Sequence, residues 1–241
     1  MLNKKKSIIT APVKLTTIVE PTSVITEQIK TIRTNINFTM TTNKLRTLMV
    51  TSAMLGEGKS TVSGNLAVEY AHDGLKVLLV DADLRRPTIF ETFGLPNQVG
   101  LSSWLGRQTA DINAAIHPTI DNLFVMTSGP KPPNPAELLG SQLMDEFLSK
   151  VTCQLDLVII DAPPILPVTD SQLLANKVDG TVLVVRENVA QKSAVRGALN
   201  VLKQSHANLL GVVLNDVSKN RRNGYYGYGK GDYNDEAYPT S

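Results

Sequence analysis

Short apolar runs alternate with helical stretches along most of the chain, and this alternation limits the possible folds more than any other feature. The runs are about five to seven residues long and nearly continuous in Val, Ile and Leu, which is typical of strands covered on both faces of a parallel sheet. The pattern predicts an α/β domain with a doubly wound, mostly parallel sheet and helices on both faces. The predicted strands are 45–51, 76–80, 123–127, 155–160, 181–185 and 209–214, and the predicted helices are 60–72, 135–150, 169–177 and 191–204.

The two ends of the chain lack this alternation. Residues 1–22 are polar and aperiodic, and residues 219–241 are rich in Gly and Tyr, so we expect a flexible arm and a flexible tail. Residues 23–218 between them are predicted to form one domain. It opens with an amphipathic helix over 23–40, because apolar residues recur there at spacings of three and four. These residues are Ile25, Ile29, Ile32, Ile36 and Met40.

Composition excludes several kinds of protein. With 241 residues, 42% of them hydrophobic, and a formal net charge of +2, the chain is suited to a packed core and gives no sign of a nucleic-acid partner. The single cysteine, Cys153, allows no internal disulfide, and no Cys/His cluster has zinc-site spacing. No apolar run approaches the roughly 18 residues of a membrane span, and no secretory signal is found. We therefore expect a cytoplasmic protein.

The segment after the first predicted strand has the pattern of a phosphate-binding loop. Residues 53–61 read Ala-Met-Leu-Gly-Glu-Gly-Lys-Ser-Thr, with Ala where the pattern has its first Gly, and a predicted helix follows. The glycines let successive backbone N–H groups face a phosphate, and the helix N-terminus attracts the same anion. Lys59 would bridge the β- and γ-phosphates, and the Ser60 hydroxyl would ligate Mg²⁺. The pattern predicts a P-loop NTPase fold with nucleotide-binding residues Gly56, Glu57, Gly58, Lys59, Ser60 and Thr61.

Carboxylates follow two of the predicted strands. Asp81 and Asp83 come after the second strand and Asp161 after the fourth, at the carboxyl ends where open α/β sheets bind their ligands. A carboxylate there without a cation is costly, and a bound Mg²⁺–nucleotide removes that cost. Asp161 is predicted to be the acidic residue that holds Mg²⁺, directly or through a water molecule. For Asp81 and Asp83 the alternative is helix capping or pairing with Arg85 and Arg86.

The tyrosines are unevenly distributed. Tyr70 stands alone, whereas the other five lie within the last 17 residues. A Gly-rich tail can bring a hydroxyl into a cleft, and a tail fixed beside one active site reaches a neighbouring copy more easily than its own site. The alternatives are an inert end and a segment that stacks on single-stranded nucleic acid. The five tail tyrosines are Tyr225, Tyr226, Tyr228, Tyr233 and Tyr238.

Together these motifs resemble those of the bacterial tyrosine kinases of capsular and exopolysaccharide synthesis. The resemblance rests on the loop at 53–61, Asp-Ala-Asp-Leu-Arg-Arg-Pro at 81–87, Pro-Pro-Asn-Pro-Ala-Glu-Leu-Leu at 132–139, Asp-Ala-Pro-Pro at 161–164 and the Tyr-rich end. It implies an ATP- and Mg²⁺-dependent protein-tyrosine kinase that autophosphorylates its C-terminal tyrosines between subunits. That modification would regulate capsular or exopolysaccharide synthesis and chain length.

The resemblance also implies roles for single residues. Lys59 would stabilise the transferring phosphoryl group, and Asp81 would orient or deprotonate the tyrosine hydroxyl. Asn215, at the end of the last predicted strand, would contact the adenine base, as a similarly placed residue does in related ATPases. The residues that would organise Mg²⁺ are Ser60, Asp83 and Asp161.

A charged triplet lies on the predicted first helix. Glu27, Lys30 and Arg33 stand at i, i+3 and i+6 and share roughly one face. The family carries a Glu-x-x-Arg-x-x-Arg oligomerisation motif on this helix, so the resemblance implies a homo-oligomer such as a ring. Lys30 departs from the motif, and Lys cannot copy the bidentate fork of Arg. A solvated charged face is the alternative interpretation.

Partners are implied by the resemblance alone. A separate transmembrane activator, a polysaccharide co-polymerase, would dock on the kinase through a cytosolic segment and recruit it to the inner face of the cell membrane. A cognate tyrosine phosphatase would remove the phosphates. No nucleic-acid partner is expected.

A second class of function shares the predicted fold, namely the non-kinase P-loop ATPase switches of the partitioning and septum-positioning type. Those proteins carry an extra Lys near the start of the loop, where this chain has Met54. Their membrane-binding members end in an amphipathic basic helix, which the Gly/Tyr-rich residues 224–229 cannot form. Both differences favour the kinase.

Overall fold

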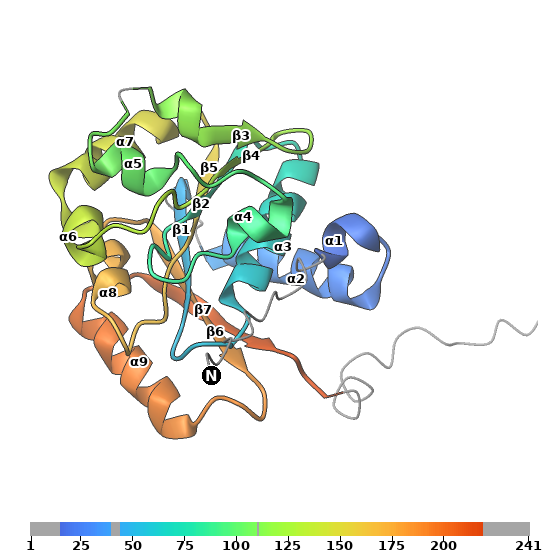
Figure 1. Cartoon of the computed structure of the whole chain (residues 1–241). Coiled ribbons are helices and arrows are strands. Elements are labelled where there is room, and N and C mark those ends of the chain that lie inside the picture. Colours follow the sequence, from blue (N-terminus) through green and yellow to red (C-terminus); the bar gives the residue numbers. More distant parts are fainter. Residues whose placement is uncertain (1–14, 40–43, 110, 219–241) are drawn as a thin grey trace, which may run out of the picture.

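A seven-stranded sheet forms the centre of the computed structural model, which describes residues 15–39, 44–109 and 111–218 (Figure 1). The strand order is β3-β4-β2-β5-β1-β6-β7, and β3 runs antiparallel to β4 while the other neighbours are parallel. The strands are β1 (Thr47–Ser52), β2 (Val77–Asp81), β3 (Ile116–Pro118), β4 (Leu123–Met126), β5 (Leu157–Asp161), β6 (Gly180–Arg186) and β7 (Leu209–Asn215).

Helices cover both faces of this sheet, as the sequence predicted. In β1, Leu48 and Val50 pack with α3 in one buried cluster, whereas Met49 belongs to a second cluster on the opposite face with residues of α5 to α9. Figure 1 shows α1, α2 and α3 grouped together, away from α6 to α9. The helices are α1 (Thr16–Val19), α2 (Val24–Thr39), α3 (Lys59–His72), α4 (Ile89–Phe93), α5 (Leu101–Leu105), α6 (Pro135–Gly140), α7 (Gln142–Thr152), α8 (Asp170–Ala175) and α9 (Lys192–Gln204), with a 3₁₀ turn at Ile112–Ala115.

The predicted strands and helices agree with the structure apart from short elements. All six predicted strands are confirmed to within a few residues, but β3 was not predicted, because three residues ending in Pro118 carry no readable alternation. The short helices α4 and α5 were missed for the same reason of length. The helix predicted over 135–150 is two helices, because Ser141 has extended backbone angles between α6 and α7.

The predicted arm is too long at its C-terminal end. Leu15 is buried, and the Thr17 backbone N–H and hydroxyl both donate to Asn65 Oδ1 on α3, at 3.0 and 2.9 Å. Residues 15–22 therefore belong to the folded body, although the four-residue α1 is too short to show periodicity in the sequence. The rest of the predicted arm and the predicted tail 219–241 lie outside the described residues.

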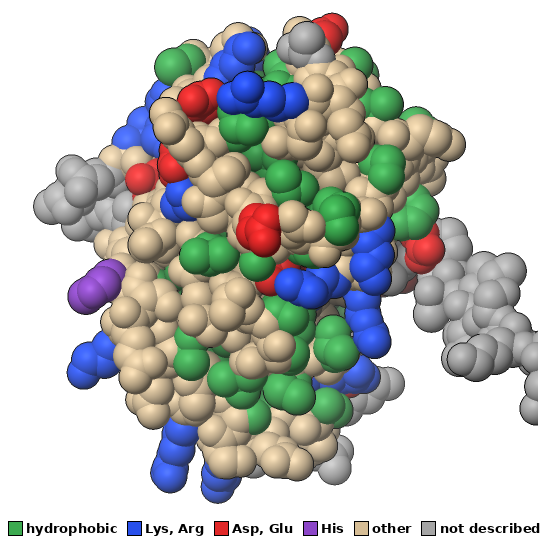
Figure 2. Space-filling model, turned by 60° about the vertical axis from the view of Figure 1, so that its left-hand side comes forward, with side chains coloured by type: hydrophobic (Ala, Val, Ile, Leu, Met, Phe, Trp, Pro, Cys, Tyr) green, Lys and Arg blue, Asp and Glu red, His purple; other side chains and the backbone are tan. Residues whose placement is uncertain are grey.

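The surface of the molecule gives little further indication of what the protein contacts. Figure 2 turns the side with α6 to α9 forward and shows hydrophobic side chains in small groups among polar and charged atoms. Within the described part of the chain, no helix combines the length and the apolar character needed to cross a membrane.

Candidate active site

The phosphate-binding loop connects β1 to α3. Gly56 and Gly58 have φ angles of 79° and 90°, in the left-handed region that favours glycine. A Cβ on Gly58 would lie 2.0 Å from Asn215 Nδ2, so this position also lacks room for a side chain. The helix α3 begins with Lys59 directly after the loop, so its N-terminus, the end of a helix that favours anions, lies at the loop.

Lys59 is the centre of a buried charge cluster. Its Nζ lies 3.0 Å from Asp83 Oδ2 and 3.6 Å from Asp161 Oδ2. The Ser60 hydroxyl donates to Asp161 Oδ2 at 2.6 Å. Burial lowers the pKa of Lys59, but the nearby carboxylates, Asp161 above all, outweigh this effect and raise the pKa above its ordinary value. The structure thus brings together residues that lie up to 102 positions apart, 161 − 59, as the sequence predicted.

Asp81 adds a further carboxylate beneath this cluster. Its Oδ2 accepts the backbone N–H groups of Thr88 and Ile89, at 3.1 and 3.0 Å, and its Oδ1 accepts that of Asp83, at 3.2 Å. Burial, assisted by the negative charge of Asp161, raises the pKa of Asp81 to about 7. The capping role that the sequence left open for Asp81 is therefore present, and its side chain is fully buried.

Asp83 and Arg85 also make contacts that the sequence left open. The Arg86 backbone N–H donates to Asp83 Oδ1 at 2.9 Å, so Asp83 caps the same turn while its other oxygen faces Lys59. Arg85 pairs with neither Asp81 nor Asp83 but with Asp170. The alternative of pairing within the segment 81–87 is therefore wrong for Arg85.

The two carboxylate oxygens of Asp161 differ in their contacts within the described residues. Its Oδ1 is buried and has no hydrogen-bond partner among the described residues. Burial raises the pKa of Asp161, and Lys59 and Ser60 oppose this increase. A buried carboxylate oxygen without a donor is expensive, so it is suited to a cation or to water held by one.

The Glu57 side chain has a structural role in the loop that the sequence did not indicate. Its side chain is 1% exposed, and Oε2 accepts the Ala53 backbone N–H at 3.1 Å. Burial raises the pKa of this carboxyl group. The carboxylate therefore stabilises the loop through a buried hydrogen bond within it. The Glu57 backbone carbonyl accepts a hydrogen bond from Asn215 Nδ2 at 3.0 Å. Because the Glu57 side chain is buried within the loop, only the backbone of Glu57 is placed to contact a nucleotide.

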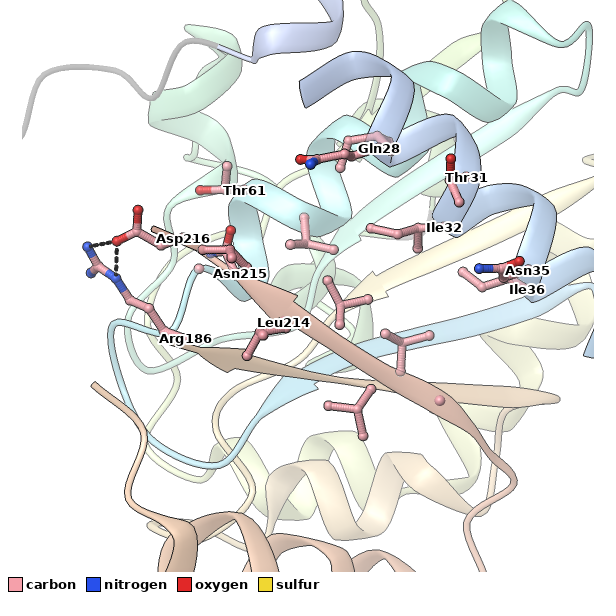
Figure 3. Close-up of a pocket in the computed structure, with 18 of the residues that line it drawn as sticks. Gln28, Thr31, Ile32, Asn35, Ile36, Thr61, Arg186, Leu214, Asn215 and Asp216 are labelled. Carbon is pink, nitrogen blue, oxygen red and sulfur yellow. Dashed lines mark hydrogen bonds and ion pairs between the residues drawn. The ribbon is translucent and has the colours of Figure 1, made fainter. Parts of the chain in front are cut away.

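A cavity of about 650 Å³ extends from the loop between α2 and β7 (Figure 3). Asn215 and Thr61 line the end of the cavity beside the loop, and their contact with a nucleotide stays a prediction. Arg186 also lines this end and was not predicted. It donates to the Gly56 carbonyl at 3.2 Å and to Asp216 Oδ2 at 2.8 and 3.0 Å. Its position directly after the apolar run 181–185 was the signal that could have found it.

The charged triplet of α2 is divided in the structure. Lys30 Nζ lies 2.8 Å from Glu27 Oε1, an exposed pair on one helix. Arg33 instead donates to the Glu69 carbonyl at 2.8 Å and lies 3.4 Å from Asp73 Oδ1, and so holds α2 against the end of α3. The alternative of a solvated face fits Lys30 but not Arg33.

Of the six tyrosines, Tyr70 lies in the described part of the chain. The five tail tyrosines lie outside the described residues, so their role stays a prediction. Tyr70 is buried, its hydroxyl is 3.0 Å from Asn37 Oδ1, and burial raises its pKa.

Comparisons with known proteins agree with this geometry. A family model described as ParA, NUBPL iron-transfer P-loop NTPase, matches residues 43–224. Tyrosine-protein kinase YwqD of Bacillus subtilis (strain 168) is 46% identical over 210 residues, which cover 86% of this chain and 89% of the relative. The kinase domain of Escherichia coli tyrosine kinase ETK is 31% identical with a TM-score of 0.80, and the match covers 94% of this chain and 89% of that one.

A crystal structure of the chimeric protein CapA2B2 is also similar, with 40% identity and a TM-score of 0.82. The match covers 85% of this chain and 90% of the chimera. Both the sequence relative and the solved structures are matched over most of their own length. This chain therefore belongs to the bacterial tyrosine-protein kinases, nucleotide-binding members of the ParA-type P-loop NTPase family.

Proposed function

We propose that this chain transfers the γ-phosphoryl group of ATP, with Mg²⁺, to the tyrosines of the C-terminal segment of another copy. The proposal is carried by the contact of Lys59 with Asp83 and Asp161 at the end of the phosphate-binding loop. One cation and several carboxylates meet there, which is the arrangement that phosphoryl transfer needs to position and neutralise a phosphate chain. The substrates within the chain are Tyr225, Tyr226, Tyr228, Tyr233 and Tyr238.

The residues present fit Mg²⁺. Asp161 Oδ1 has no donor among the described residues, and Ser60 and Asp83 offer further oxygen atoms close by. No cluster of three or more His, Cys, Asp or Glu side chains in the described ranges could hold a metal alone, which suits an ion bound by one or two carboxylates, phosphate oxygens and water. When bound, Mg²⁺ neutralises charge on the β- and γ-phosphate oxygens.

The chain's own groups perform the remaining tasks. The loop N–H groups hold the phosphates, and Lys59 stabilises the charge that develops on the transferring group. The tyrosine oxygen forms a bond to the γ-phosphorus while the bond to the ADP oxygen breaks, and the hydroxyl proton passes to Asp81. Because Asp81 is buried under the turn that reaches Thr88 and Ile89, the end of this turn at Thr88 and Ile89 moves aside when the substrate enters, whereas its start at Asp83 stays in place.

The residues directly before the tail, 216–218, form its root, and their contacts support a substrate role for the tail. The Ser218 backbone N–H donates to Glu187 Oε2, and Asp216 pairs with Arg186, which also touches the loop (Figure 3). Tyr225 lies seven positions after Ser218, 225 − 218, so it can extend about 24 Å from this root. The tail thus starts at the same side of the sheet as the nucleotide site.

Partners and regulation complete the proposal. Several copies assemble through α2, a separate transmembrane activator recruits them to the inner face of the membrane, and a tyrosine phosphatase resets the tail. Each phosphate adds roughly −1.5 to −2 charges, so a few modifications make the tail strongly negative and alter assembly. This cycle regulates capsular or exopolysaccharide synthesis.

Mixing two variants tests transfer between copies. One chain carries Lys59→Met and an intact tail, and the other is active but has Phe at all five tail tyrosines. With ATP, Mg²⁺ and the activator, mass spectrometry should find phosphate on residues 225–238 of the Lys59→Met chain. A phosphate-free tail in this mixture, with full modification of the wild type alone, would show transfer within one chain. ATP hydrolysis by the wild type without tail phosphate would instead favour a nucleotide switch.

A further inference from the structure

A bidentate ion pair links two loops of the active site. Arg85 Nε lies 3.0 Å from Asp170 Oδ2, and Arg85 Nη2 lies 2.9 Å from Asp170 Oδ1. The Asp170 side chain is fully buried, while that of Arg85 is 38% exposed. Two parallel bonds between planar groups fix orientation as well as distance, which a single contact does not.

Arg85 belongs to the turn that carries Asp83. Its chain neighbour Arg86 donates a backbone N–H to Asp83 Oδ1, and Asp83 Oδ2 faces Lys59. The same turn continues to Thr88, whose backbone N–H donates to Asp81. Any displacement of Arg85 therefore moves the amides that orient both carboxylates.

Asp170 belongs to the segment that follows Asp161. It begins α8, and the next residue, Ser171, donates its hydroxyl to the Pro163 carbonyl. The Thr51 hydroxyl of β1 donates to the same carbonyl at 2.7 Å. The start of α8 is thus fixed to the strand ends beside Asp161, so Asp170 is a rigid anchor for the Arg85 turn.

We propose that Arg85 and Asp170 are a positioning pair that holds Asp83 at the distance from Asp161 that nucleotide-bound Mg²⁺ requires. In this role both residues act through the turn and need no contact with the nucleotide or the tyrosine. The metal role rests on the proposed function, whereas the ordering of the turn does not. Groups that orient metal ligands typically affect metal affinity or activity by about 10- to 100-fold.

The first experiment needs neither metal nor activity. In the ligand-free protein, Arg85→Lys and Asp170→Asn should increase hydrogen exchange at the amides of Arg86, Thr88 and Ile89 at least about fivefold. The matched control is Asp145→Asn, which removes the partner of Lys177 in an ion pair of similar length near the other end of α8. This control should leave the three amides unchanged. Equal exchange in all variants would overturn the proposal.

The second experiment separates positioning from general stability. With fluorescent ADP, Arg85→Lys should raise the Mg²⁺ concentration for half-maximal binding about 10-fold, while ADP affinity without Mg²⁺ stays within about twofold. Lys keeps the charge but loses the fork, so a folded variant is expected. If binding weakens equally with and without Mg²⁺, the pair is merely structural and the proposal is wrong. If the Mg²⁺ effect appears but the wild type phosphorylates no tail, the proposed function fails and the positioning pair stands.

Discussion

Lys59 and Lys30 each lie within 3.0 Å of a carboxylate oxygen, yet their surroundings are opposite. The Lys59 side chain is 10% exposed and faces Asp83 and Asp161, whereas that of Lys30 is 41% exposed and faces Glu27 on its own helix. Removing one partner of a buried pair leaves an uncompensated charge, but an exposed helical pair contributes little to stability. Identical residue types thus form a buried charge cluster in one region and, in the other, an exposed pair that contributes little to stability.

The buried cluster is also costly to the folded protein. Burial raises the pKa of both Asp81 and Asp161, so each carboxylate is less stable ionised there than in water. Lys59 compensates only part of this charge. A core selected for stability alone would avoid such a group of acids, which is why we attribute the cluster to phosphate and metal chemistry.

The largest effect is expected from Lys59→Met. In the proposed mechanism this change removes the cation that stabilises the transferring phosphoryl group, so tail phosphorylation should fall by at least about 100-fold. Mass spectrometry of the tail measures this, and circular dichroism should show a folded domain. Lys150→Met, the same change at an exposed position late in α7, is the control and should keep the wild-type rate. Wild-type phosphorylation by Lys59→Met would move the active site elsewhere.

The next effect concerns pH and the stability of the ligand-free protein. The folded pKa of Asp81, about 7, lies above its ordinary value of 3.8, so between these values the folded state holds a proton that the unfolded chain has lost. Stability from this group is therefore present at low pH and lost as pH rises toward 7. Urea unfolding from pH 4.5 to 7.5 should show this fall in the wild type, and Asp81→Asn should show a smaller one. Parallel curves would contradict the raised pKa.

The same contrast explains what could be predicted from sequence. The residues of the buried cluster could be predicted, because each follows an apolar run or stands in the phosphate-binding loop. Parallel strands bring their carboxyl ends to one edge of the sheet, so the local pattern was sufficient to place these side chains together. They are Lys59, Asp81, Asp83 and Asp161. The partner of Arg33 is a backbone carbonyl 36 residues away, which no side-chain pattern records. The Arg85–Asp170 pair likewise joins segments 85 residues apart, and its existence depends on how α8 packs.

Arg33 should give an intermediate effect, because it is partly buried and bonded to α3. Arg33→Ala should lower the free energy of unfolding by roughly 1.5 kcal/mol through the lost charged hydrogen bond. Urea unfolding measures this change.

The same residue tests assembly through α2. Glu27→Ala combined with Arg33→Ala should give smaller particles in light scattering if α2 mediates assembly. Asp73→Asn removes the 3.4 Å contact to Arg33 without altering Glu27 or Lys30, so it should leave the particle size unchanged. An unchanged size in the double variant would exclude the triplet from assembly.

The smallest effect is expected from Lys30→Ala. Both side chains of the Lys30–Glu27 pair are exposed, and hydrogen bonds to water readily replace the pair. The thermal midpoint of unfolding, measured on monomeric protein, should therefore shift by no more than about 1 °C. Differential scanning calorimetry at low and at high salt measures this shift, and the two salts should agree because little charge interaction is lost. A decrease as large as that of Arg33→Ala would show that the exposed pair behaves like a buried one. The distinction between the two lysines would then have to rest on the number of carboxylates around each, and no longer on exposure to water.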